Sequence, residues 1–82
     1  MSEYNRVCWH SRRGMLELDL LLEPFVQQRY LELSEHEQEC YRHLLTCEDQ
    51  ELFGYFLGRV EPEDPRLAEI VNIVLEFARR RD

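Results

Sequence analysis

Hydrophobic residues recur every three or four positions through most of the chain, which is the spacing of helices that bury one face. The clearest stripes are Leu18, Leu21, Leu22 and Phe25, and later Leu67, Ile70, Val71, Val74 and Phe77. No segment alternates polar and apolar residues for long, and no dipeptide typical of a hairpin turn appears. The sequence therefore predicts an all-α protein, folded over residues 1–82 as a single domain and a compact five-helix bundle.

Two predicted helices occupy the first third of the chain. The first covers residues 3–12, with Ser2 as its N-cap and Gly14 as the residue that ends it. The second covers residues 15–30 and contains Pro24. Because proline removes a backbone hydrogen bond and clashes with the preceding turn, we expect a kink or a break near residues 20–24.

Three further helices have clear start signals. The segment Ser34–Glu37 is a capping box and opens the third helix. Asp49 is the predicted N-cap of the fourth helix, which Gly58 ends. Asp64 followed by proline opens the fifth, with Asp as N-cap and Pro as the first helical residue. Residues 78–82, at the end of this helix, are expected to fray.

Composition limits what a chain of 82 residues can be. A core this small leaves no room for separate cofactor and substrate domains. The longest apolar run, Leu20–Leu22, is far short of the ~20 residues that span a bilayer, and the N-terminus lacks a secretory signal. The three cysteines are an odd number, which favours free thiols over a disulfide framework. We therefore expect a cytoplasmic protein that does not insert into a membrane.

The charge balance argues against a nucleic-acid partner. The chain has 17 acidic and 10 basic residues, a net charge of -7, and no lysine. Phosphate backbones repel such a chain unless its cations are segregated on one face. The basic runs are Arg12–Arg13 and Arg79–Arg81, and the second suits the negative end of the last helix. We expect no nucleic acid as partner, and a monomer.

Two groups of residues resemble chemical sites but have simpler explanations. Cys40, His43 and Cys47 share one face of the third helix, yet a structural zinc takes four ligands, and cysteine is among the most buried residue types. Core packing is therefore favoured over a zinc-binding helical domain. The run His36–Cys40 lacks the second histidine of the zinc-protease signature H-E-x-x-H. We expect no catalytic residue, no metal ligand and no stably bound cofactor.

The segment 12–19, which reads RRGMLELD, is the most informative about function. Gly14 forms a tight corner between two helices and, having no Cβ, lets another backbone approach closely. Arg13 and Glu17 stand four positions apart, and Asp19 follows in the early part of the second helix. One interpretation is a capped corner with an internal Arg13–Glu17 pair. The other is a charged surface that docks on a partner protein, since Arg is enriched at such sites.

The sequence Arg13-Gly14-x-x-Glu17 resembles the R-G-x-x-E motif of the small FAD assembly factors that flavinylate succinate dehydrogenase. The residues around it follow the pattern of that family: Trp9, Arg12, Leu18-Asp19, Pro24-Phe25, Ser34, Leu44-Leu45, Cys47, Glu48-Asp49 and Leu52-Phe53. The resemblance covers roughly residues 5–60, and the fold of the family is also a five-helix bundle. One departure is Tyr55, where many members carry a tryptophan, and Gly54 beside it is a poor helix residue.

The resemblance implies an assembly chaperone and not an enzyme. Such a factor binds the flavoprotein subunit of succinate dehydrogenase, and often that of fumarate reductase, and promotes covalent attachment of FAD to a client histidine. The FAD belongs to the client, and the factor acts by positioning. The resemblance implies that Arg13, Gly14 and Glu17 contact the client, with Arg12 and Asp19 beside them. Some members have been labelled antitoxins of a membrane-protein toxin, which is the alternative function.

The same resemblance includes a tryptophan near the corner. Trp9 stands shortly before the arginine pair, on the predicted first helix. The resemblance implies a packing role for Trp9, with partial exposure as the alternative.

Overall fold

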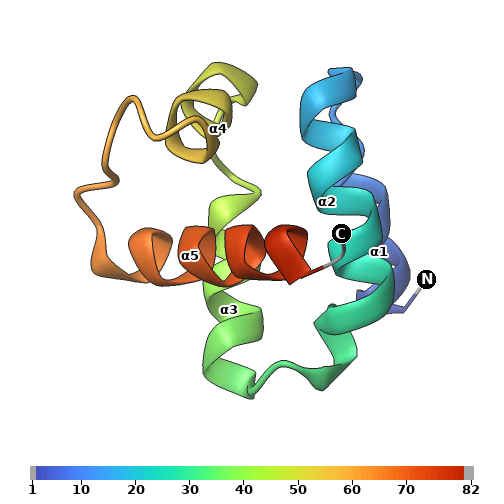
Figure 1. The fold of residues 1–82 in the computed structure, drawn as a ribbon. Coiled ribbons are helices and arrows are strands. Elements are labelled where there is room, and N and C mark those ends of the chain that lie inside the picture. Colours follow the sequence, from blue (N-terminus) through green and yellow to red (C-terminus); the bar gives the residue numbers. More distant parts are fainter. Residues whose placement is uncertain (1, 81–82) are drawn as a thin grey trace.

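The computed structural model describes residues 2–80, which form five α-helices and one short 3-10 helix (Figure 1). These elements are α1 (Glu3–His10), α2 (Leu16–Arg29), η1 (Tyr30–Glu32), α3 (Glu35–Leu44), α4 (Asp49–Phe56) and α5 (Pro65–Arg80). None of residues 2–80 lies in a strand. The prediction of an all-α chain with five α-helices is confirmed.

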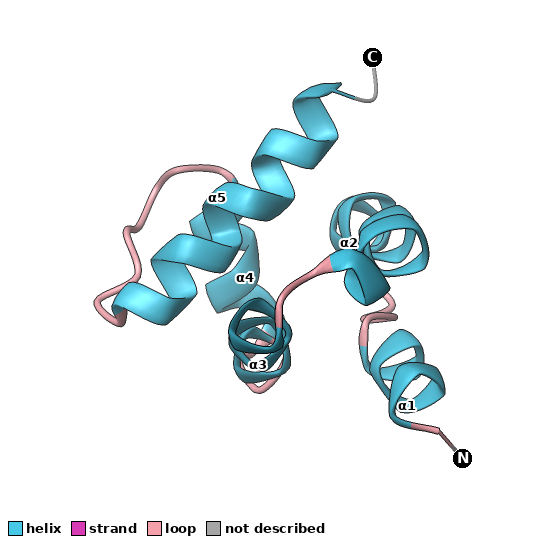
Figure 2. Ribbon diagram, turned by 90° about the horizontal axis from the view of Figure 1, so that it is seen from below, coloured by secondary structure: helices cyan, strands magenta, loops and turns pink. Residues whose placement is uncertain are grey.

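Helix α5 lies across the other helices and contacts α2, α3 and α4 (Figure 1). Helices α2 and α3 run in opposite directions and are joined by η1, while α1 packs beside α2, on the side away from α5 (Figure 2). The sequence of α5 explains this central place, because its apolar residues form one buried face. The buried residues are the five predicted ones: Leu67, Ile70, Val71, Val74 and Phe77.

The core is closed by aromatic rings from three helices. The Phe25 ring of α2 lies 5.4 Å from the Tyr41 ring of α3 and 5.5 Å from the Phe77 ring of α5, measured between centroids. Phe25 and Tyr41 are fully buried. Because each buried aromatic or aliphatic side chain stabilises the fold by about 1.5–3 kcal/mol, this cluster accounts for much of the stability of a small domain.

We expected a kink or a break near residues 20–24; helix α2 is continuous through Pro24, so the break does not occur. Proline in a helix interior costs about 3 kcal/mol, mainly because its nitrogen cannot donate to the carbonyl four residues earlier. That carbonyl belongs to Leu20, which is 62% exposed and so lies on the solvent side of α2. Leu22 and Phe25, on the opposite side, are fully buried. Their burial, at about 1.5–3 kcal/mol each, outweighs the cost of the proline.

The predicted N-cap of α1 is confirmed, because the Ser2 hydroxyl accepts a hydrogen bond from the Asn5 N–H at 3.1 Å. Two further predicted capping motifs are confirmed. Before α3, the Ser34 hydroxyl accepts a hydrogen bond from the Glu37 N–H at 3.1 Å, and the Ser34 N–H donates to the Glu37 carboxylate at 2.9 Å. Before α5, the Asp64 carboxylate accepts a hydrogen bond from the Arg66 N–H at 2.9 Å. Both motifs satisfy backbone donors that the first turn of a helix leaves without partners.

The start of α4 differs from the prediction, because its N-cap is Glu48 and not Asp49. The Glu51 carboxylate accepts a hydrogen bond from the Glu48 N–H at 3.0 Å, which places the cap one residue earlier. Asp49 becomes the first helical residue, and its carboxylate is engaged by an arginine described below. Gly58 has a φ of +73° just after α4, as expected of a glycine that ends a helix.

The last helix continues further than predicted. Helix α5 is helical to Arg80, where an ion pair of 3.6 Å joins the Arg80 guanidinium to the Glu76 carboxylate one turn earlier. Of the residues expected to fray, 78–80 are helical in the structure, while residues 81 and 82 lie outside the described part of the chain. Among residues 2–80, no helix combines the length and the hydropathy of a membrane-crossing segment.

Candidate functional site

Arg13 occupies the corner between α1 and α2, and its guanidinium points into the protein. Its Nη1 donates to the carbonyls of His10 at 3.0 Å and Leu45 at 3.1 Å. Its Nη2 donates to the carbonyl of Cys47 at 2.6 Å, and its Nε pairs with the Asp49 carboxylate at 2.8 Å. The side chain is only 14% exposed, so these contacts are partly shielded from water.

The acceptors around Arg13 explain why an arginine stands there. His10 ends α1, and Leu45 is the C-cap of α3, so Arg13 meets carbonyls that have no partner within their own helices. Helix C-termini also carry partial negative charge. The planar guanidinium can serve several acceptors at once, which an ammonium group cannot do in a fixed geometry. Arg13 therefore joins the ends of α1 and α3 to the start of α4.

The expectation that α1 reaches residue 12 is wrong, since α1 ends at His10 and Ser11 is its C-cap. Gly14 then takes a left-handed conformation, with a φ of +79°, as predicted for the corner. Asp19, in the first turn of α2, accepts a hydrogen bond from the Arg13 N–H at 2.8 Å. This bond closes the corner from the side of α2, so Asp19 is a half-buried structural partner of the loop.

The predicted internal pair between Arg13 and Glu17 is not formed, because Arg13 pairs with Asp49. The spacing of four residues places two side chains together only within one helix, and Arg13 lies before α2 begins. Glu17 is instead exposed on the first turn of α2. In the R-G-x-x-E motif, the Arg13 side chain is therefore turned inward, whereas the Glu17 side chain is exposed and can contact a partner.

Large apolar side chains are exposed next to this corner. Trp9 is 68% exposed, Leu16 68% and Leu20 62%, so the expectation that Trp9 packs in the protein is wrong. The side chain of Arg12 is 67% exposed, and its Nε forms an ion pair of 3.0 Å with the Glu23 carboxylate of α2. Trp9, Arg12 and Glu23 share a groove of about 370 Å³ between α1 and α2.

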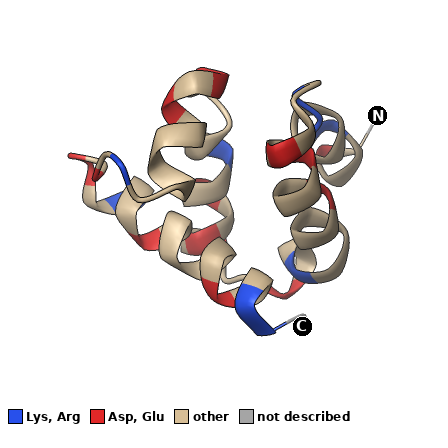
Figure 3. Cartoon of the chain, turned by 45° about the horizontal axis from the view of Figure 1, so that its top comes forward, with Lys and Arg blue, Asp and Glu red and all other residues tan. Residues whose placement is uncertain are grey.

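We call the exposed residues at this end of the molecule the corner surface; they are Trp9, Arg12, Gly14, Leu16, Glu17 and Leu20. On α2, Leu16, Glu17 and Leu20 lie next to one another, because residues three or four apart on a helix are neighbours. Basic and acidic segments meet at this corner (Figure 3). An exposed apolar patch edged by charges is typical of a protein-binding site.

Three residues of the corner surface, Trp9, Leu16 and Leu20, were not predicted as site residues. Leu16 and Leu20 are four positions apart and lie outside the buried stripe of α2. This spacing was the sequence signal that could have predicted an exposed apolar pair. The signal for Trp9 was its position outside the stripe of Tyr4, Val7 and Cys8, which is the face of α1 that packs against the core.

The other candidate ligands, Cys40, His43 and Cys47, do not converge, in agreement with the favoured packing interpretation. The Cys40 thiol is buried, the His43 ring bonds the Asp64 carboxylate at 3.1 Å, and Cys47 packs against the core. Burial raises the pKa of the Cys40 and Cys47 thiols above the ordinary value. All three cysteines of the chain are free thiols in the structure, as expected.

Comparison with known proteins gives matches to one family and to relatives that share one name. A family described as flavinator of succinate dehydrogenase matches residues 5–78. The protein named FAD assembly factor SdhE of Pseudomonas putida is 56% identical over 75 residues, covering 92% of this chain and 89% of that protein. The protein of the same name from Pseudomonas aeruginosa is 53% identical over 92% of this chain and 89% of its own length. The one from Idiomarina loihiensis is 48% identical over 92% and 83%.

The fold places this chain in the class of small all-α proteins, and its R-G-x-x-E segment forms the corner between α1 and α2. Within this class, the chain belongs to the family of succinate dehydrogenase flavinators, a family of FAD assembly factors. The match to the family includes α5, which the sequence motifs alone had linked to it only by pattern.

Proposed function

We propose that this protein binds the flavoprotein subunit of succinate dehydrogenase and promotes covalent attachment of FAD to a histidine of that subunit. Membership of a family of FAD assembly factors supports the assembly role. The flavoprotein subunit of fumarate reductase is a second client in this proposal. The FAD is bound by the client, and the factor works as a cytoplasmic monomer that contributes contacts and no cofactor.

The observation that carries the proposal is the corner surface itself. Arg13 and Asp19 hold the corner from inside, so that Gly14 and Glu17 are presented in a fixed arrangement. A preformed surface of this kind binds with little loss of conformational freedom. In the proposal, Arg12, Gly14 and Glu17 touch the client together with the apolar residues of the corner surface, whereas Arg13 and Asp19 act through the shape of the corner.

The mechanism that fits this surface is positioning. A factor that binds both the flavin domain and the capping domain of its client can hold the client histidine and the flavin at reacting distance. Holding reactants in place contributes as much as ~7–11 kcal/mol to lowering a barrier in favourable cases. The reacting groups on this account all belong to the client and its FAD.

The test is co-expression with the flavoprotein subunit in cells that lack such a factor, with covalent flavin measured by in-gel fluorescence. We expect fluorescence with the wild type and loss of fluorescence with Glu17→Ala. Glu61→Ala is the matched control, because Glu61 is also exposed but lies in the loop before α5. The thermal stability of Glu17→Ala should stay within ~0.5 kcal/mol of the wild type. Equal fluorescence with and without the protein would refute the proposal and favour the antitoxin alternative.

A second pair of variants tests the apolar part of the corner surface. Leu16→Glu places a charge beside Glu17 and should abolish flavinylation. Leu31→Glu is its control, since Leu31 is 69% exposed against 68% for Leu16 but lies in η1, at the other end of α2. Equal loss in both variants would mean that general damage, and not the corner surface, explains the effect.

Gly14 offers a third test, because its φ is positive and its surroundings are open. A Cβ at this position would meet no atom within 4 Å, so the fold leaves space on the outside of the corner. Asparagine tolerates the left-handed conformation better than other residues, whereas arginine adds bulk as well as strain of ~1–2 kcal/mol. We expect Gly14→Asn to retain flavinylation and Gly14→Arg to lose client binding while remaining folded.

A further inference from the structure

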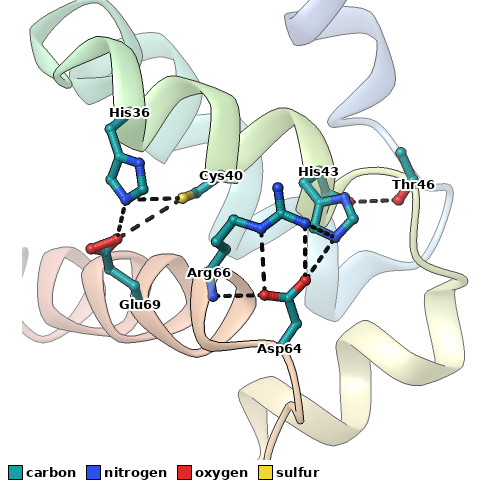
Figure 4. Close-up of polar contacts among 7 residues, drawn as sticks. All are labelled: His36, Cys40, His43, Thr46, Asp64, Arg66 and Glu69. Atoms are coloured by element: carbon teal, nitrogen blue, oxygen red, sulfur yellow. Dashed lines mark hydrogen bonds and ion pairs between the residues drawn. The ribbon is translucent and has the colours of Figure 1, made fainter.

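Three potential metal ligands meet between α3 and α5, on an element pair that the corner surface does not use (Figure 4). The His36 Nε2 lies 2.9 Å from the Glu69 Oε2 and 3.7 Å from the Cys40 Sγ. The Cys40 Sγ lies 3.9 Å from the same Glu69 oxygen. These atoms form a small triangle contributed by two helices.

The size of this triangle fits a zinc ion. Zinc binds thiolate sulfur at about 2.3 Å, and histidine nitrogen and carboxylate oxygen at about 2.0–2.2 Å. In a tetrahedral site with these bond lengths, the ligand atoms lie about 3.3–3.6 Å apart. The observed separations of 2.9, 3.7 and 3.9 Å differ from that range by only a few tenths of an ångström.

We propose that His36, Cys40 and Glu69 bind one Zn²⁺ ion, with the fourth position taken by water. The donor set of imidazole, thiolate and carboxylate is one that zinc accepts, and three protein ligands leave one position open. Binding releases the proton of the Cys40 thiol to solvent, and the imidazole proton of His36 moves from Nε2, which faces Glu69, to Nδ1. The hydrogen bond between His36 and Glu69 is replaced by their bonds to the metal.

The fold prepares this site in two ways. His36 and Cys40 stand four positions apart on α3, so their side chains share one face. Further along α3, His43 bonds the Asp64 carboxylate at 3.1 Å at the start of α5. This second contact keeps the facing turns of α3 and α5 together, so Glu69 is held opposite His36 without the metal.

Exposure is graded across the site in a way that suits ion entry. Cys40 is 1% exposed, whereas the side chains of His36 and Glu69 are 63% and 43% exposed. A metal can therefore approach from solvent over the imidazole and the carboxylate and meet the thiol at the bottom. The sequence signal for this site was the run His36–Cys40, which resembles the zinc-protease signature H-E-x-x-H but lacks its second histidine. In the proposed site, the third ligand is Glu69 from another helix.

The test uses the full-length protein after treatment with a chelator and a reductant. Calorimetric titration with ZnCl₂ should show one Zn²⁺ per chain, and thermal stability should rise with zinc. Titration with CoCl₂ should give the charge-transfer absorption of a thiolate–cobalt bond together with the d–d bands of a tetrahedral site. Cobalt reports ligand type directly, which binding heat alone does not.

Single variants identify the ligands. Loss of even an outer partner of a metal ligand costs 10–100-fold in affinity, so His36→Gln, Cys40→Ala and Glu69→Gln should each weaken zinc binding about 100-fold or more. Cys47→Ala and His10→Gln are matched controls, because they remove a thiol and an imidazole elsewhere in the chain and should bind zinc as the wild type does. His36 and Glu69 are exposed, so their variants test the site even where Cys40→Ala disturbs the core.

Absence of the thiolate–cobalt band would overturn the proposal. So would unchanged affinity in His36→Gln and Glu69→Gln, or a loss of affinity in the two controls as large as that in the site variants. The proposal is independent of the flavinylation proposal, since both sets of measurements use different residues and different readouts.

Discussion

The structure assigns Arg13 a large share of the stability of the corner, which can be measured by removing its donors. Arg13→Met keeps much of the apolar stem but deletes every hydrogen bond of the guanidinium. The carbonyls of His10, Leu45 and Cys47 then lose their charged donor, and the Asp49 carboxylate loses its cation. All of these groups lie where α1, α3 and α4 meet.

The expected loss follows from the number of bonds and their exposure. A hydrogen bond to a charged group contributes about 1.5–3 kcal/mol, so three carbonyl contacts set an upper limit of roughly 4.5–9 kcal/mol. Exposed ion pairs contribute about 0–1 kcal/mol, which sets the lower limit. Arg13 is 14% exposed, but Asp49 is 40% exposed and water can replace part of what is lost. We expect a loss of about 2–4 kcal/mol, out of about 4–12 kcal/mol for a domain of this size.

The assay is urea and thermal unfolding followed by far-UV circular dichroism. For a domain of this length, 1 kcal/mol shifts Tm by ~4–8 °C, so Tm of Arg13→Met should fall by roughly 10–30 °C. Arg13→Lys should lose most of the same stability, because one ammonium cannot reach the four acceptors in the fork geometry. Arg12→Met is the control: its side chain is 67% exposed, and its loss should stay below ~1 kcal/mol.

One result would refute this account of the corner. If Arg13→Met and Arg12→Met lose equal stability, both below ~1 kcal/mol, the contacts of Arg13 do not hold the helix ends together. In that case, any loss of flavinylation in Arg13→Met would have to come from direct contact with the client.

Three smaller predictions concern other parts of the fold. Gly54→Ala should stabilise the protein by ~0.8–1 kcal/mol, because alanine has a higher helix propensity than glycine and the added Cβ would meet Val60 at an ordinary contact distance of 3.6 Å. The measurement is Tm, which should rise; an unchanged or lower Tm contradicts this. In urea unfolding, Ser11→Ala should lower the free energy of unfolding by about 1–3 kcal/mol and Tyr41→Phe by about 0.5–1.5 kcal/mol, because only Ser11→Ala leaves the buried Tyr41 hydroxyl without the Ser11 Oγ that it contacts at 2.7 Å. The double variant should lose less stability than the sum of the two single variants, and strict additivity would contradict the pairing. The side-chain and backbone donors of Arg66 lower the pKa of Asp64 below 3.8, so its stabilising contribution is present above that value and is lost as pH falls through the lower folded pKa. Asp64→Asn, which still caps the helix, should therefore lose less stability than the wild type as pH falls through the range in which the Asp64 carboxylate becomes protonated, and identical acid profiles would contradict the assignment.

Local signals in the sequence were sufficient for the number and approximate positions of the five α-helices and for the buried face of α5, but not for every helix end or for α4, where Leu57 of the predicted stripe is exposed. Periodicity identified the buried residues of α5, and the capping motifs at Ser34 and Asp64 fixed two helix starts. These features depend on residues within one or two turns of each other, so they can be recognised without knowing the fold. The motif of Arg13, Gly14 and Glu17 likewise identified the family before any coordinate was known.

Only the tertiary structure decided which partners meet across the chain. The Asp49 carboxylate lies far from Arg13 in sequence, yet it pairs with Arg13 in place of the nearby Glu17. The same holds for Glu69, which joins His36 from another helix. Contacts of this kind depend on how helices pack, and the local pattern is equally compatible with several packings.

The packing of the helices against one another also determines the course of α2 through Pro24 and the exposure of Trp9. Local propensity predicted a kink or a break at the proline, and burial of neighbouring side chains in the core keeps the helix unbroken. Trp9 is exposed because the face of α1 that packs is set by α2 and α3, not by the hydrophobicity of one residue. The sequence by itself thus determined the five α-helices, the buried stripe of α5 and the motif, whereas the packing free energy of the whole core determined the corner surface and the ligand triangle.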